Sequence, residues 1–206
     1  MKRFYQDQRP HRGLDFDEYV DSIRELALEP ITDDLDETTR NRRASAPINL
    51  RRTTRILKTY VIPEEVRRTI HMLREPQLWM VLTEPWCGDS AQCLPYIARL
   101  AECNTLIHLK FLLRDMNPDI MDEYLTDGTR GIPKLVAFDR QGNELFRWGP
   151  RPREGQEVFL RAKAEGLTQA EALERLHLWY GRNRGKALEE ELLALIQESA
   201  GVREKA

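Results

Sequence analysis

Hydrophobic positions in the middle of the chain form short apolar runs that are separated by amphipathic segments. Residues 78–82 (Leu-Trp-Met-Val-Leu) are continuously apolar, which indicates a buried strand. The same reading gives further strands at 106–113, 134–138 and 144–148, and helices at 91–102, 117–124 and 154–163. The predicted order along this part of the chain is therefore β-α-β-α-β-β-α.

This order of elements constrains the sheet. The first two strands are joined through a helix, so we expect them to be parallel. The last two strands flank the turn-like segment 139–143 (Asp-Arg-Gln-Gly-Asn), which predicts an antiparallel hairpin. The sequence therefore predicts an α/β fold with a mixed four-stranded sheet and helices on both faces.

The first third of the chain has helical periodicity. Segment 15–29 places its apolar residues on one face, and Pro63-Glu64-Glu65 opens a helix, with Pro63 in the first turn, that ends near Arg74. Between them, acidic residues within 33–37 precede seven basic residues within 40–58. This charge switch fits either an electrostatic partner or solvated helix faces that pair with each other, and we favour the second interpretation.

The last forty residues also read as helical. Thr168 and Glu171 form a capping-box pattern, and Gly181 and Gly185 punctuate the segment before a second helix at 186–198. The apolar stripe of that helix is typical of core packing rather than a partner site. We therefore divide the chain into an N-terminal helical extension (1–76), an α/β core (77–165) and a C-terminal helical extension packed on the core (166–206).

Composition narrows the functional classes. The chain has 206 residues, 41% hydrophobic content and a net charge of −2, so no overall field favours a nucleic acid or membrane partner. We expect a cytoplasmic protein, because three cysteines are too few for a disulfide scaffold and neither a signal peptide nor a membrane span is evident. The four histidines are scattered and no Gly-rich phosphate loop occurs, so we expect no metal and no cofactor.

The segment Trp86-Cys87-Gly88-Asp89-Ser90 carries the candidate chemistry. It follows the first predicted strand and precedes a helix, where backbone N–H groups and the helix dipole favour a thiolate. We therefore expect the Cys87 thiol to titrate below its free value of about 8.5. The structural alternative is that Cys87 is a small buried hydrophobic residue.

Four features give the segment around this motif a family resemblance. Trp86-Cys87-Gly88 stands at a strand end, and Pro95 lies in the following helix, eight residues after Cys87. Ile132-Pro133 precedes a strand, and Gly149 follows sixteen residues after Pro133. Together with the element order, they make residues 78–163 resemble the thioredoxin-like superfamily. Segments 83–89, 113–115 and 148–152 look like a little-characterised bacterial group of that superfamily, which carries helical additions.

The resemblance implies roles for particular residues. Cys87 would be the attacking thiolate, and Pro133, if cis, would let Ile132 present its backbone N–H and C=O to an extended substrate. The alternative for Pro133 is an ordinary trans proline before a strand. Trp86 would shape the site rather than react. The expected catalytic residues are Cys87, Ser90 and Pro133, and the expected substrate-binding residues are Trp86, Gly88, Asp89, Ile132 and Gly149.

The motif also departs from the family pattern. Ser90 replaces the second cysteine, Asp89 occupies a position where proline is common, and Val81 occupies the position of a buried aspartate. The charge of Asp89 opposes a thiolate at Cys87, and Glu84 is a disfavoured substitute for the missing acid.

Cys93 is a weak candidate for the resolving thiol. Six helical residues separate it from Cys87 by a rise of about 9 Å, whereas a disulfide needs Cα atoms about 4.4–6.8 Å apart. We expect structural burial for Cys93 and for Cys103.

Two functional hypotheses remain. In the first, a monothiol Cys-x-x-Ser site exchanges disulfides with a protein or small-molecule thiol through a mixed disulfide on Cys87. In the second, the protein is a non-catalytic binding module that uses the groove beside Pro133. The charged residues Arg114, Asp115, Asp119 and Arg130 either line one face near the site or form surface ion pairs, which we favour.

Overall fold

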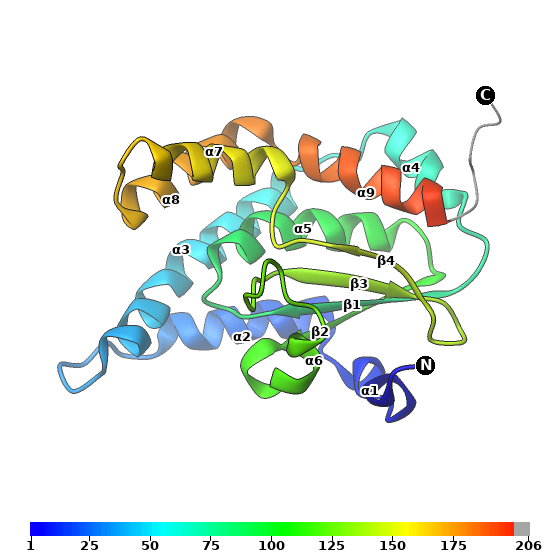
Figure 1. The fold of residues 1–206 in the computed structure, drawn as a ribbon, viewed down its shortest axis with the longest axis horizontal. Coiled ribbons are helices and arrows are strands. Elements are labelled where there is room, and N and C mark those ends of the chain that lie inside the picture. Colours follow the sequence, from blue (N-terminus) through cyan, green and yellow to red (C-terminus); the bar gives the residue numbers. More distant parts are fainter. Residues whose placement is uncertain (200–206) are drawn as a thin grey trace.

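A computed structural model describes residues 1–199 and contains a four-stranded sheet in the order β2-β1-β3-β4 (Figure 1). Strands β1 and β2 are parallel, and the pairs β1–β3 and β3–β4 are antiparallel. This confirms the predicted mixed sheet. The strand bounds are β1 Gln77–Thr83, β2 Ile107–Leu113, β3 Lys134–Phe138 and β4 Glu144–Trp148.

Helices surround this sheet and occupy both ends of the described chain. They are α1 Arg3–Gln6, α2 Phe16–Leu28, α3 Glu37–Thr59, α4 Glu64–His71, α5 Gly88–Glu102, α6 Pro118–Asp122, α7 Arg153–Ala164, α8 Gln169–Asn183 and α9 Lys186–Ser199. Short 3-10 turns, η1 Pro10–Arg12 and η2 Arg114–Met116, connect some of them. Over residues 1–199, no helix is both long and apolar enough to cross a membrane.

The two faces of the sheet bury separate cores. Successive side chains of a strand point to opposite faces, and in β1 Trp79 and Val81 join the larger core, whereas Met80 and Leu82 join the smaller one. The larger core packs against α5 and the added helices, and the smaller one against α1 and α6. Figure 1 shows α4, α7, α8 and α9 on the same side of the sheet as α5.

Helix α3 is the largest element that the hydrophobic pattern does not predict. It begins after Asp36, whose carboxylate accepts a hydrogen bond from the Thr39 backbone N–H, and it packs against α2 and α5. Some of its basic side chains pair as expected for solvated helix faces, such as Arg43 with Glu29. Others, namely Arg51, Arg52 and Arg55, form no ion pair within residues 1–199.

The ends of the predicted helices lie within three residues of the observed ones, with the largest differences at the start of α5 and the end of α4. The capping box predicted at Thr168 of α8 forms, and a second one, which was not predicted, forms at Asp15 of α2. Pro63, however, is the N-cap of α4 rather than a first-turn residue. Helix α8 also continues through Gly181 and stops only where Arg184 and Gly185 adopt positive φ angles of 54° and 88°.

Candidate functional site

Cys87 lies at the N-cap of α5, directly after the loop that follows β1. Its Sγ accepts a hydrogen bond from the Ser90 backbone N–H at 3.5 Å and donates one to the Ile132 carbonyl oxygen at 3.4 Å. The Ile132–Pro133 peptide bond is cis. The fold therefore brings Cys87 and Ser90 next to Ile132 and Pro133, although 45 positions of sequence separate Cys87 from Ile132.

The environment of Cys87 favours the thiol over the thiolate. The residue is only 8% exposed, and burial, followed by the charge of Asp89, raises the pKa of Cys87 to about 11. Hydrogen bonds from Ser90 act in the opposite direction but are outweighed. The expectation that Cys87 titrates below 8.5 is therefore wrong, because the desolvation cost exceeds what the helix N-terminus contributes.

Asp89 faces the protein interior rather than a substrate surface. Its carboxylate accepts hydrogen bonds from Arg151 Nη2 and from the Tyr180 hydroxyl, both at 2.7 Å. Burial raises the pKa of Asp89, and the charge of Arg151 opposes this. Asp89 thus links the first turn of α5 to α8 through Tyr180 and to the segment after β4 through Arg151. Neither partner of Asp89 was predicted from the sequence.

The other two cysteines are not placed to react together with Cys87. Cys93 is completely buried, and its Sγ donates to the Tyr180 hydroxyl at 3.6 Å. Cys103 is half-buried at the C-terminal end of α5, and its thiol donates to the Arg99 carbonyl oxygen at 3.5 Å. A helix rises about 1.5 Å per residue, so about 24 Å separates Cys103 from Cys87.

Ser90 belongs to a buried chain of hydroxyl groups. The Thr83 hydroxyl donates to Ser90 Oγ at 2.8 Å, which leaves the Ser90 proton available for the Cys87 sulfur. Tyr19 OH lies 3.2 Å from Thr83 Oγ1. Glu84 is also buried, but its Oε1 accepts from the Asp115 backbone N–H at 2.7 Å, and burial raises its pKa.

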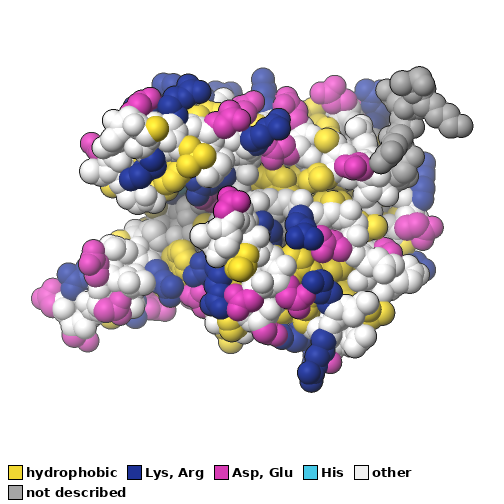
Figure 2. All heavy atoms as spheres, viewed as in Figure 1, with side chains coloured by type: hydrophobic (Ala, Val, Ile, Leu, Met, Phe, Trp, Pro, Cys, Tyr) yellow, Lys and Arg dark blue, Asp and Glu magenta, His cyan; other side chains and the backbone are white. Residues whose placement is uncertain are grey.

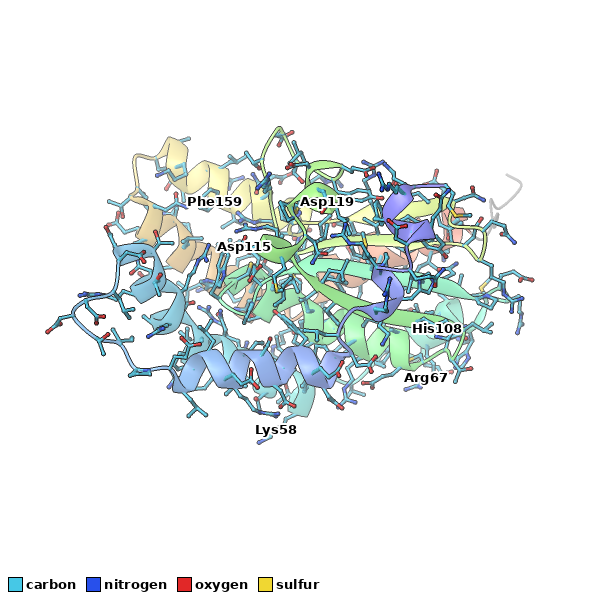
Figure 3. All side chains as sticks on the ribbon, turned by 90° about the horizontal axis from the view of Figure 1, so that it is seen from below. Lys58, Arg67, His108, Asp115, Asp119 and Phe159 are labelled. Carbon is cyan, nitrogen blue, oxygen red and sulfur yellow. The ribbon has the colours of Figure 1, made fainter. Side chains whose placement is uncertain are left out.

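Two guanidinium groups lie against the Trp86 ring. The Arg42 and Arg114 guanidinium carbons lie 4.6 and 4.9 Å from its ring centroid. Asp115 pairs with both arginines, at 3.1 and 2.7 Å. Figure 3 places the labelled Asp115 at the same end of the molecule as the labelled Phe159, away from Arg67. Arg42 comes from α3, and no sequence signal links it to Trp86.

All four charged residues named in the sequence form ion pairs, as favoured. Arg114 pairs with Asp115, but its guanidinium group also lies against the Trp86 ring, so this pair stands beside the site as well. Asp119 pairs with Arg9, and Arg130 pairs with Asp122, as expected for surface ion pairs.

Both glycines assigned to the site are constrained by close neighbours. Gly149 has a φ of +111°, and a Cβ there would lie 2.1 Å from the Pro133 carbonyl oxygen, so only glycine fits. A Cβ on Gly88 would lie 3.0 Å from His177 Cε1 of α8. The C-terminal extension therefore covers one side of the first turn of α5.

A pocket of about 770 Å³ lies beside the cis-proline segment. Gly131, Ile132, Gly149 and Pro150 form part of its wall, and Trp148, Phe159 and Leu195 supply much of its apolar surface. Ile132 both contacts the Cys87 sulfur and lines this pocket. A groove is therefore present next to Ile132, the residue before Pro133, and α7 of the core and α9 of the C-terminal extension contribute to its wall.

Comparison with solved structures shows the same fold elsewhere. A Pseudomonas aeruginosa protein of unknown function aligns over 92% of this chain and 95% of its own, with 19% identity and a TM-score of 0.58. An HIV epitope scaffold aligns over 93% and 97%, with 18% identity and a TM-score of 0.60. At these identities the likeness concerns the fold alone.

Sequence comparison identifies the family. No curated protein matches the chain. A family model described as thioredoxin matches residues 36–170, which is well over half of the chain and includes α3, the sheet, the Cys87 turn and the cis-proline segment. The chain therefore belongs to the thioredoxin family.

Proposed function

We propose that this protein performs thiol–disulfide exchange through a single cysteine, Cys87. The observation that carries the proposal is the position of the Cys87 sulfur, between the Ser90 N–H at the start of α5 and the Ile132 carbonyl before Pro133. A substrate disulfide that lies along the cis-proline segment would come close to the sulfur, which must become more exposed for the attack because Cys87 is only 8% exposed.

The exchange proceeds in two displacements. The Cys87 thiol loses its proton to solvent, and the thiolate attacks one sulfur of the substrate disulfide. A mixed disulfide forms, and the other substrate sulfur leaves as a thiolate that takes up a proton. Ser90 has no thiol, so an external thiolate attacks the substrate sulfur of the mixed disulfide. The bond to Cys87 breaks, the Cys87 sulfur leaves as a thiolate and takes up a proton, and the external thiol and the substrate half leave joined by a new disulfide.

The raised pKa sets the speed of the first step in the free protein. A pKa of about 11 leaves about one Cys87 in ten thousand as thiolate at pH 7. Exchange is therefore slow unless the bound substrate changes the environment of the sulfur. This favours a selective reaction with docked substrates over general reduction of disulfides.

Trapping of the mixed disulfide tests the proposal. An aromatic disulfide reagent should label wild-type Cys87 covalently at alkaline pH, and Cys87→Ser should abolish that adduct. Cys103→Ser is the matched control, since Cys103 lies on the same helix and is the other cysteine with some exposure. Equal labelling of wild type and Cys87→Ser under native conditions would contradict the proposal.

A binding module without turnover is the second candidate. It is favoured by the 8% exposure and the raised pKa of Cys87, together with the pocket at Ile132. Disulfide reduction by wild type and by Ser90→Cys separates the two functions. We expect slow turnover by wild type and faster turnover by the dithiol variant. Turnover by the variant alone would favour the binding module and reject monothiol exchange.

A further inference from the structure

A second pocket, of about 320 Å³, lies between α3, α5 and α8, and is separate from the pocket at Ile132. Three arginines of α3, Arg51, Arg52 and Arg55, line it together with Gln92 of α5 and His177 of α8. Figure 2 shows the surface hollowed between α7–α8 and the N-terminal half of α3, whereas the three arginines of this pocket lie in the C-terminal half of α3. The pocket belongs mainly to the helical extensions.

The arginine charges on this pocket are not neutralised. Arg51 and Arg55 are four residues apart and Arg52 and Arg55 three apart, spacings that place like charges side by side on a helix. Within residues 1–199, none of the three forms an ion pair. Their neighbour on the same helix Arg42, by contrast, pairs with Asp115.

Arg52 is the least solvated of the three. Its Nη1 donates to Asn49 Oδ1 at 3.2 Å and lies 3.5 Å from the position that a Cβ of Gly88 would occupy. Desolvation, and then the charge of Arg55, lower the pKa of Arg52, and the charge of Asp89 opposes them only in part. A half-buried cation in this setting gains from a counter-charge inside the pocket.

The remaining walls also suit an anion. The Gln92 side-chain amide donates to His177 Nδ1 at 3.4 Å, so the neutral imidazole keeps its proton on Nε2 as a donor. The N-terminal end of α5, with its positive dipole end, lies against His177 and Arg52 through Gly88. Glu174 is the carboxylate at this pocket, and it is exposed and unpaired with the arginines.

We propose that this pocket binds the carboxylate or phosphoryl group of a small anionic ligand. Guanidinium groups match both groups as bidentate donors. The volume is that of a small ligand site. The inference does not depend on the chemistry of Cys87, because no atom of that residue is needed for the anion to bind.

Calorimetric titration of the full-length protein tests the proposal. The probes are inorganic phosphate and succinate, each against sodium chloride at equal ionic strength. We expect wild type to bind at least one probe, and the affinity to fall tenfold or more in both Arg51→Gln and Arg55→Gln. Arg68→Gln is the matched control, since Arg68 is an exposed, unpaired arginine of α4 outside the pocket.

Two further observations locate the bound probe and identify the group that is recognised. The imidazole resonances of His177 should shift with the bound probe, whereas those of the exposed His71 should not. If only phosphate binds, the pocket recognises a phosphoryl group. If only succinate binds, it recognises a carboxylate group. The proposal is overturned if neither probe binds beyond the chloride control, or if both pocket variants bind as well as wild type.

Discussion

At the scale of single residues, the site illustrates a competition between a helix N-terminus and burial. Ser90 donates its N–H to the Cys87 sulfur, as expected for an N-cap cysteine, yet the pKa of Cys87 is raised to about 11. The type of residue at the turn was readable from the sequence. Its exposure was not, because it depends on Asp89 and on helices that cover the turn.

Asp89→Asn should make Cys87 more reactive. The carboxylate raises the pKa of Cys87, and its removal also leaves the Arg151 cation without a counter-charge, so the pKa should fall. Each unit of decrease increases the thiolate fraction about tenfold at pH 8. Site-resolved alkylation by mass spectrometry, from pH 7 to 11, measures this. The control is Asp21→Asn on α2, and an unchanged alkylation profile in Asp89→Asn would refute the argument.

At the scale of elements, the strands and helices with strong apolar periodicity were predicted correctly. The strands and helices of residues 77–164 match their predictions to within a few residues. Helix α3 escaped prediction because its buried face includes the polar residues Asn49 and Thr53, and because Pro47 lies inside it. Arg42, Arg151 and Tyr180 were missed for another reason, since each reaches the site only through the packing of distant helices.

The α5–α8 contact should depend on the hydroxyl group of Tyr180. Tyr180→Phe removes the hydrogen bond to the buried Asp89 carboxylate and the acceptor of the Cys93 thiol. A hydrogen bond to a charged group contributes about 1.5–3 kcal/mol, and we expect a loss of that size in urea unfolding. Tyr5→Phe is the control, because the Tyr5 hydroxyl donates to a neutral carbonyl, that of Asp139, and should cost about 1 kcal/mol. Equal losses in the two variants would contradict the assignment.

At the scale of the whole molecule, parts of both extensions build around the site, whereas α1 of the N-terminal extension packs on the opposite face of the sheet. Helix α3 supplies Arg42 to Trp86, and α8 supplies Tyr180 to Asp89 and His177 to the first turn of α5. The family resemblance of residues 78–163 located the Cys87 turn and the cis-proline segment, but it carried no information on these contacts. The stability of the site and of the extensions is therefore coupled.

This coupling predicts a specific dependence of stability on pH. Burial, and then the charges of Arg52 and Arg151, lower the pKa of His177 to about 4, against about 6.5 in an unfolded chain. Between these values the unfolded state binds the additional proton, so stability rises with pH through this window and is lost as pH falls from about 6.5 towards 4. The shift corresponds to at most about 3.4 kcal/mol.

Urea unfolding of wild type and His177→Gln at pH 4.5, 5.5 and 7, in buffers without phosphate or polycarboxylates, measures the effect. The variant should lose the part of the pH dependence that His177 contributes, so its stability relative to wild type should improve as pH falls. Carboxyl groups with raised pKa values, such as Glu84 and Asp89, titrate in both proteins and cancel in the difference. His71→Gln, at an exposed position, should follow wild type at every pH. Parallel curves for wild type and His177→Gln would show that His177 is not buried in its neutral form, and that the C-terminal extension does not seal the first turn of α5.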